Sequence, residues 1–384
     1  GSDCFLQHTI LAGGVTLGEG VTVEDHSVIS EGCVIGEKAN VSAAVKIWPR
    51  KSVSPGSVVS ETMVWGDRTG GELFYGSRAW GVINSEITPE FAARFGAAFG
   101  ASLGGEGTIL VSRDADRASQ ISTRSLFCGA MSVGVDVEDL GIAPIPVVRW
   151  LLSKNPRLAG VHIRKSPREA SGQDMIFFNS SGSDLSTSQT RSIERVLDRE
   201  DFPRVDYRRL GTLSRPSDST ADYRAALVGA VNDIAIRLAG FKVVVDYSHG
   251  STARVLPGIL SELGVDVVNV NAVVDPNRIS RTRDRLYADQ DRLAMIVESL
   301  GADAGFMIDP SGEKLHLVDD AGRLLDEDAE LCVVTDLFIR TENPNAIAAP
   351  ISATMGVNRL AREAGFELKH TRNNHLAMME AAMS

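Results

Sequence analysis

One hydroxyl group in this sequence is surrounded by cations. The stretch VHIRKSPREASGQDMIFF, residues 161–178, begins as a buried strand and then places Ser166 beside Arg164, Lys165 and Arg168. Guanidinium and ammonium groups form strong charge-assisted hydrogen bonds with phosphate oxygens. Ser166 is therefore a candidate catalytic residue that would carry a phosphoryl group, and the three cations are candidate phosphate-binding residues. The alternative is a loop that is inert or only binds an anion.

A second group of side chains has the chemistry of a metal site. In DPSGEK, residues 309–314, Asp309 and Glu313 supply carboxylates and Ser311 supplies a hydroxyl. Mg²⁺ prefers oxygen ligands in a near-octahedral arrangement. These three residues are therefore the candidate Mg²⁺ ligands, with Lys314 as a neighbouring phosphate-binding cation. The alternative is a simple turn between two strands.

His249 is a weaker candidate. It lies in DYSHGST, between a predicted strand and a predicted helix. A glycine-containing loop in that place can hold phosphate at a helix N-terminus. The alternative is again only a turn.

Alternating helices and strands must position these groups. Thr88 followed by Pro89 predicts a helix start, and Phe91, Phe95 and Phe99 recur on one helical face. Short strands and helices then alternate, which implies sheets covered on both faces. Further helices are expected at residues 119–132, from Pro146, and at 221–238, 255–263 and 326–340. The predicted domains are a connector at 67–85 and α/β/α domains at 86–212, 213–300 and 301–384, the last incomplete or final.

The amino-terminal residues 1–66 contain a hexapeptide repeat. Aliphatic or aromatic residues recur six apart without a break from Phe5 to Val59. Such a repeat is typical of a left-handed parallel β-helix with three hexads per coil, so we expect Leu11, Ile29 and Ile47 to form one ladder, and Leu17, Ile35 and Val53 another. A solenoid needs neighbours or a cap, which favours a homo-oligomer formed through the β-helix. His8 and His26 could serve an acyltransferase, but are better explained as turn residues.

Composition limits the class of protein. The formal net charge is −11, which argues against general nucleic-acid binding. No apolar run approaches the roughly 18 residues of a membrane-spanning helix, and no secretory signal is visible. The four cysteines form no Cys-x-x-Cys pair, which suits reduced thiols in a cytoplasm. Because the sequence opens with Gly1-Ser2 and stops within a predicted helix, we expect a fragment of a longer protein.

From about Phe74 onward the sequence resembles the α-D-phosphohexomutases, the phosphomannomutase and phosphoglucomutase group. The resemblance is carried by GVINSEITPEFAARFGAAFGASL, VSRDADRAS, SVGVDVEDLGIAPIPVVRW, FKVVVDYSHGSTARVLPGILSELG and VDDAGRLL. It implies three similar α/β/α domains and a fourth at the carboxyl end. Behind a hexapeptide β-helix, this segment is similar to the rear part of bacterial mannose-1-phosphate guanylyltransferases that carry a mutase-like region.

The resemblance also implies roles for individual residues. Ser166 falls on the family's phosphoserine, which passes its phosphoryl group to a bound hexose phosphate. Residues 309–314 fall on the metal loop, and Arg113 falls on a Gly-Arg-Asp position, where the alternative is a structural ion pair. Arg78 stands two residues before Trp80, which occupies the position of a family arginine. The implied ligand is a hexose phosphate and the implied cofactor is Mg²⁺.

Other positions differ from the family pattern. Pro167 and Arg168 replace a His-Asn pair, and Ile176 replaces the lysine credited with proton transfer. We therefore expect the carboxyl-terminal portion of a sugar-nucleotide pyrophosphorylase, mannose-1-phosphate guanylyltransferase-like, whose mutase-like region is degenerate and structural or regulatory. The alternative is an active phosphomannomutase or phosphoglucomutase that transfers phosphate through Ser166 with Mg²⁺.

Overall fold

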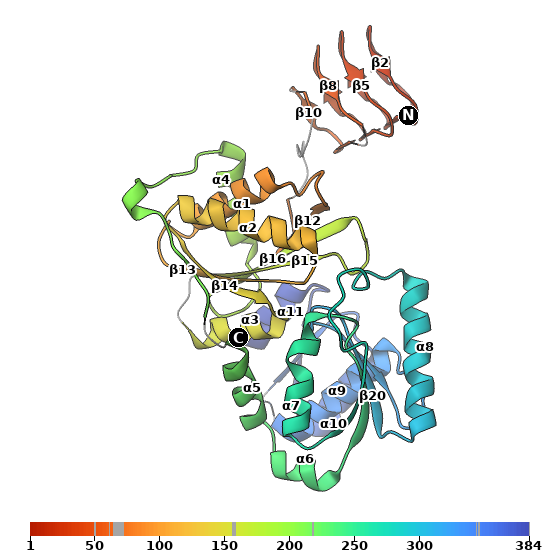
Figure 1. The fold of residues 1–384 in the computed structure, drawn as a ribbon. Helices are drawn as coiled ribbons and strands as arrows, with labels where there is room; N and C mark the ends of the chain where they lie inside the picture. Colours follow the sequence, from red (N-terminus) through yellow and green to blue (C-terminus); the bar gives the residue numbers. More distant parts are fainter. Residues whose placement is uncertain are drawn as a thin grey trace. The chain divides into compact units, whose positions relative to one another are not determined.

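The computed structural model in Figure 1 describes residues 1–49, 51–60, 62–63, 73–155, 159–216, 219–342, 344 and 346–383. Two units make up the chain: Gly1–Tyr75 with Trp80–Ala92, and Gly76–Ala79 with Ala93–Ser384. Of the connector predicted at 67–85, residues 67–72 lie outside the described residues.

Three parallel sheets of two-residue strands form the amino-terminal part of the first unit. One sheet contains β1 (Phe5–Leu6), β4 (Thr22–Val23), β7 (Asn40–Val41) and β10 (Val58–Val59). Another contains β2 (Ile10–Leu11), β5 (Val28–Ile29) and β8 (Lys46–Ile47), and the last contains β3 (Thr16–Leu17), β6 (Val34–Ile35) and β9 (Ser52–Val53). The chain therefore visits the three sheets in rotation.

Register in these sheets follows the expected period of three hexads. Both predicted ladders are confirmed, because Leu11–Ile29–Ile47 and Leu17–Ile35–Val53 are aligned across their strands. The aligned side chains of the later strands are buried together with the small residues that precede them, including Cys33, Ala39 and Val45. An apolar core runs along the inside of this repeat.

The first strand departs from the expected pattern. Leu6, not Phe5, is aligned with Val23, and Phe5 is aligned with Thr22. Phe5 is 55% exposed. The prediction that Phe5 belongs to the series of inward-facing residues is therefore wrong. The segment that leads from β1 to β4 is one residue shorter than the segment that leads from β4 to β7, so Leu6 takes the aligned place.

Both amino-terminal histidines lie in turns between strands. His8 and His26 have positive φ angles of 41° and 60°, a left-handed conformation that non-glycine residues adopt mainly in turns. His8 Nδ1 lies 2.6 Å from Asp25 Oδ1. These positions agree with the turn interpretation of the two histidines.

Strands and helices alternate along the second unit. Its first sheet has helices on both faces. Five neighbouring strands of this sheet run in the order β16 (Gly172–Asn179), β15 (Ala159–Lys165), β13 (Thr108–Arg113), β14 (Asp136–Ile142) and β17 (Leu213–Ser214). The helices in this region are α1 (Pro89–Ser102), α2 (Arg117–Ser132), α3 (Ile145–Lys154) and α4 (Thr187–Arg199). Figure 1 shows α2 on one face of the sheet and α3 on the other. The expected two-sided covering is confirmed.

The start of α1 also agrees with the sequence. Two short strands, β11 (Phe74–Tyr75) and β12 (Arg78–Val82), precede this helix in the chain. The Phe91 N–H donates to Thr88 Oγ1 at 3.2 Å, so Thr88 caps the helix as predicted. Phe91, Phe95 and Phe99 are all buried.

A second sheet corrects one predicted boundary. Its order is β19 (Asp266–Val270), β18 (Lys242–Asp246), β20 (Ala304–Ile308) and β21 (Leu315–Val318). The predicted cut between residues 300 and 301 therefore falls inside one sheet. Gly301 ends a helix that the sequence analysis missed, α8 (Arg283–Leu300), where it adopts the left-handed C-cap conformation at φ 55°.

The remaining elements follow the expected order with one difference. The helix predicted at 221–238 is two helices, α5 (Ser219–Gly229) and α6 (Asp233–Ala239), because Asn232 caps a new helix. The other elements are α7 (Leu256–Glu262), α9 (Glu327–Glu342), β22 (Ala346–Pro350), α10 (Met355–Ala364), β23 (Glu367–Thr371) and α11 (His375–Met383). Among the described residues, no helix combines the length and apolar character needed to cross a bilayer.

The buried ladder gives a stability test. Ile29→Ala should lower the free energy of unfolding of the first unit by about 2–4 kcal/mol, because it leaves a cavity inside the repeat. Val34→Ala, at a strand position that is 48% exposed, is the matched control and should cost under about 0.5 kcal/mol. Urea unfolding monitored by circular dichroism measures both; equal losses would contradict a core inside the repeat.

Candidate functional site

Ser166 follows β15, an inner strand of the first covered sheet. Strand β15 lies between β13, which is parallel to it, and β16, which is antiparallel. Parallel strands end at the same edge of a sheet, where open α/β sheets bind their ligands. Ser166 is placed at this carboxyl edge.

The loop holding Ser166 is closed by backbone hydrogen bonds. The Ser166 N–H donates to Gly172 O at 2.8 Å. Ser166 Oγ accepts the N–H groups of Arg168 and Glu169 at 3.4 and 3.3 Å. The residue is only 6% exposed. Its hydroxyl is therefore held inward by two long, and hence weak, hydrogen bonds.

This loop also contacts the segment before α8. Ser280 Oγ donates to Ser166 O at 2.6 Å, and the Arg281 N–H donates to Pro167 O at 3.0 Å. The closed conformation of the Ser166 loop therefore depends on residues that are distant in the sequence.

Arg164 is bound by carboxylates. Its Nε donates to Asp174 Oδ2 at 3.0 Å and its Nη1 to Glu313 Oε2 at 3.2 Å, with Asp309 Oδ2 3.8 Å from Nη1. Burial by itself lowers the pKa of Arg164, but Asp174, Glu313 and Asp309 more than offset it and raise that pKa above its ordinary value. The charge predicted to bind phosphate is already neutralised in this arrangement.

Three guanidinium groups surround Glu313. Arg78 Nη2 and Arg164 Nη1 both lie 3.2 Å from Oε2, and Arg149 Nη2 lies 3.5 Å from Oε1. Asp309 Oδ1 accepts the N–H groups of Glu313 and Lys314 at 2.6 and 2.8 Å. The 309–314 segment is thus a turn between β20 and β21 whose two carboxylates are engaged by hydrogen bonds and cations.

This turn does not fit Mg²⁺ as it stands. A divalent cation at Glu313 would lie among three positively charged side chains, and charge repulsion opposes that placement. Ser311 is buried, and its carbonyl accepts the Ile145 N–H at 3.0 Å. Within the part of the chain that the structure describes, no group of three or more His, Cys, Asp or Glu residues is placed to hold a metal ion.

The loop containing His249 supports the same turn. The Ser251 N–H donates to Pro310 O at 3.0 Å. A Cβ atom on Gly250 would clash with the backbone of Pro310, so only glycine fits there. The following 3₁₀ helix has four residues, too few for a phosphate site at its N-terminus. Gly250 allows the loop after β18 to pack closely against the 309–314 turn.

The other cations that were predicted to bind phosphate do not gather around Ser166. Lys165 Nζ lies 3.6 Å from Asp116 Oδ2. Arg113 Nη1 donates to Asp114 O at 2.8 Å, and burial lowers the pKa of Arg113. Arg168 and Lys314 are exposed. Of the predicted phosphate-binding cations, only Arg78 and Arg164 meet at one point, and there they bind a carboxylate.

The sequence did not single out several polar residues that form ion pairs at this site. Arg149 donates to Asp184 Oδ1 at 2.8 Å, and His375 Nδ1 lies 2.9 Å from Asp184 Oδ2. Burial raises the pKa of Asp184, but hydrogen bonds from His375 and Arg149 outweigh it and hold that pKa well below its usual range. Asp174 could have been found, since a hairpin centred on residue 169 pairs it with Arg164. No sequence signal marks Arg149.

His162 is another buried group on β15. Its Nδ1 lies 2.7 Å from Ser112 Oγ, while Nε2 is buried without a hydrogen-bond partner among the described residues. Burial, followed by the charges of Arg164 and Arg78, lowers the pKa of His162 well below its ordinary value. The imidazole is therefore neutral at physiological pH.

Two segments of the chain match the domains of one family. Residues 71–204 match the phosphoglucomutase/phosphomannomutase α/β/α domain I, and residues 221–322 match its α/β/α domain II. The match to domain II extends past residue 301 and includes the 309–314 turn. The sheet formed by β18 to β21 includes the same turn.

Whole-chain comparisons point the same way. The chain is 30% identical to a phosphoglucomutase/phosphomannomutase of Thermococcus kodakarensis over 82% of its own length and 69% of that relative. It is 30% identical to a phosphoglucosamine mutase of Halorhodospira halophila over 74% of its length and 63% of that relative. The chain thus spans about two thirds of these relatives.

Solved structures share the fold. A phosphoglucomutase/phosphomannomutase family protein of Burkholderia thailandensis superposes with a TM-score of 0.71 at 20% identity, over 81% of this chain and 68% of that one. This likeness supports the multidomain α/β architecture.

Removing the central carboxylate gives the first test of the site. Glu313→Gln should lower the free energy of unfolding by about 2–3 kcal/mol, because three arginines lose a charged partner and keep only an amide oxygen. Lys314→Gln, at the exposed neighbouring position, should change it by less than about 0.5 kcal/mol. Millimolar Mg²⁺ should leave the melting temperature of the unmodified chain unchanged. A Mg²⁺-dependent rise that Glu313→Gln removes would contradict this assignment.

Asp114 gives a pH-dependent test. Burial raises the pKa of Asp114 to about 6, so the folded chain keeps this proton at pH values where the unfolded chain has lost it. The contribution of Asp114 to stability should therefore fall by about 3 kcal/mol as the pH rises from about 3 to 7. Unfolding free energies of the unmodified chain and Asp114→Asn, measured across this range, should diverge accordingly. Asp3→Asn, at an exposed carboxylate, is the charge control; a constant difference for Asp114→Asn would refute the assignment.

Proposed function

This chain belongs to the phosphoglucomutase/phosphomannomutase family, and on that premise we propose that it acts on hexose phosphates by phosphoryl transfer through Ser166. One observation carries the proposal. The Ser166 hydroxyl lies at the carboxyl end of β15, where the backbone N–H groups of Arg168 and Glu169 point at its oxygen.

Transfer at this serine would proceed by exchange of one bond for another. A bond forms between Ser166 Oγ and the phosphorus of a hexose bisphosphate while the bond from phosphorus to the sugar oxygen breaks. The hydroxyl proton of the serine ends on the released sugar oxygen, and the reverse step returns the phosphoryl group to a different sugar hydroxyl. Such transfers depend on positioning and on charge stabilisation.

The residues of the loop have separate parts in this proposal. The N–H groups of Arg168 and Glu169 stabilise negative charge near Oγ, and the exposed guanidinium of Arg168 can turn toward a phosphoryl group. Because Ser166 is 6% exposed, the loop has to open before a sugar phosphate can reach Oγ. Opening gives up the hydrogen bonds from Ser280 and Arg281 to Ser166 O and Pro167 O.

Mg²⁺, which the family resemblance implies, has no part in these steps. Its candidate ligands Asp309 and Glu313 are engaged by backbone N–H groups and by arginines. We therefore derive no step through a metal ion.

A second candidate is hexose-phosphate binding without transfer, as a structural or regulatory region. Ile176 favours it, because this residue stands where the family's lysine is expected and is fully buried in a core cluster with Leu110 and Phe178. The expected link to a mannose-1-phosphate guanylyltransferase has no support from the relatives reported above, whose names are those of mutases. The relatives therefore favour transfer over this second candidate.

In this proposal the amino-terminal repeat has a structural role. We propose that residues 1–66 form a left-handed parallel β-helix and that copies of the chain associate through it. The register of three hexads and the buried ladders support the β-helix.

Phosphorylation of Ser166 separates the two candidates. After incubation with a hexose 1,6-bisphosphate, mass spectrometry should find one added phosphoryl group on the peptide containing Ser166, and Ser166→Ala should abolish it. Arg168→Gln should slow labelling about 10-fold through loss of one charged hydrogen bond. Lys314→Gln serves as the control for an exposed cation outside the Ser166 loop.

A coupled mutase assay then measures turnover in the same proteins. Labelling with turnover supports transfer. Binding of hexose phosphate without labelling would favour the second candidate and sink the first.

A further inference from the structure

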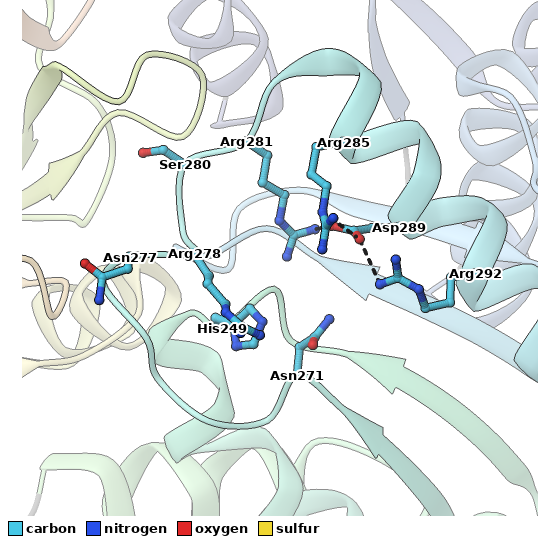
Figure 2. A pocket seen from close by; sticks show the side chains of 9 residues that line it. All are labelled: His249, Asn271, Asn277, Arg278, Ser280, Arg281, Arg285, Asp289 and Arg292. Carbon is cyan, nitrogen blue, oxygen red and sulfur yellow. Dashed lines mark hydrogen bonds and ion pairs between the residues drawn. The ribbon is translucent and has the colours of Figure 1, made fainter.

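A cavity lined by arginines lies between the end of β19 and the first turns of α8. Its volume is about 330 Å³, at the small end of the range for ligand sites. All nine lining residues are polar or charged, and they include Arg278, Arg281, Arg285 and Arg292 (Figure 2). A cavity with this lining suits a small polar ligand.

One carboxylate serves three of these arginines. Asp289 lies 3.3 Å from Arg281 Nη1, 3.3 Å from Arg285 Nε and 3.0 Å from Arg292 Nη1. Arg278 reaches Asp275 at 3.5 Å. Positive charge is therefore in excess around Asp289, in a chain whose net charge is −11. An anion in the cavity would relieve the repulsion among the three guanidinium groups.

Arg281 has a donor that nothing in the described part of the chain accepts. Its side chain is 9% exposed, and Nη2 is buried without a hydrogen-bond partner there. An arginine stays charged at all physiological pH values, and a buried donor left unmade costs about 1–3 kcal/mol. A ligand oxygen in the cavity that Arg281 lines would satisfy it.

We propose that this cavity binds a phosphate group, either as the free ion or as the phosphate monoester of a small molecule. Planar guanidinium groups match the oxygen pairs of phosphate, and several of them can share one phosphate. His249 and Asn271 line the opposite side and supply further polar atoms (Figure 2). This site is separate from Ser166 and does not depend on phosphoryl transfer there.

The cavity is nevertheless linked to the Ser166 loop. Ser280 and Arg281, which line the cavity, hold Ser166 O and Pro167 O through the hydrogen bonds described above. A phosphate bound by Arg281 fixes the segment that closes the loop over Ser166. The site therefore couples phosphate occupancy to access at the serine.

Calorimetric titration with inorganic phosphate and with glucose 6-phosphate, at low ionic strength, tests the site. The double variant Arg285→Gln/Arg292→Gln should weaken binding of both probes at least about 10-fold, because charged hydrogen bonds are lost. Arg283→Gln is the matched control, since this exposed arginine begins the same helix and does not line the cavity. Equal affinities for the two probes identify the phosphate group alone as the ligand, and tighter binding of the ester identifies a phosphorylated small molecule.

Further variants separate loss of phosphate binding from loss of the fold. Arg281→Met removes the unmet donor and should also weaken binding, and its melting temperature reports whether the fold survives. Ser166→Ala should retain phosphate binding. Absence of binding by the unmodified chain, equal loss in Arg283→Gln, or loss in Ser166→Ala with retention in the double variant would each overturn the proposal.

Discussion

The carboxylate of Glu313 joins parts of the second unit that are far apart in sequence. Arg78, Arg149 and Arg164 come from a strand, a helix and another strand, and all three reach the same side chain. Arg164 is buried, so its charge needs partners inside the protein. The turn between β20 and β21 is therefore fixed against the first sheet by electrostatics, and the Ser166 loop is built beside that fixed point.

The two arginine clusters of this unit differ in how many carboxylates balance their positive charge. Around Glu313, Asp174 and Asp309 share Arg164, and Asp184 shares Arg149. Around Asp289, a single carboxylate faces three arginines, and one buried donor has no partner in the described residues. The excess positive charge is thus found at residues 278–292, and the cations nearest Ser166 in sequence contribute little of it.

The sequence predicted the features that depend on local period, and it was less informative about contacts between distant segments. The ladders of the amino-terminal repeat follow from spacing alone, and the helix start at Thr88 follows from its cap. The sequence analysis placed a domain boundary at Gly301. A glycine that ends a helix and a glycine that separates two domains look alike in the local sequence, and Gly301 is the former. Only the pairing of β18 with β20 distinguishes the two cases. Ser166 was located correctly at a strand end, but the directions of Arg164 and Lys165 depend on carboxylates from other strands and loops.

The register of the amino-terminal repeat sets a rule for changes in chain length. Because each strand after β1 pairs with the strand three hexads later, adding or deleting three hexads there inserts or removes a whole coil and leaves every other pairing intact. A change of one hexad keeps the aliphatic positions inward but moves all later strands to the next sheet. A change by any fraction of a hexad turns inward residues outward. Natural length variation in this region should therefore come in whole hexads, with three at a time the least disruptive.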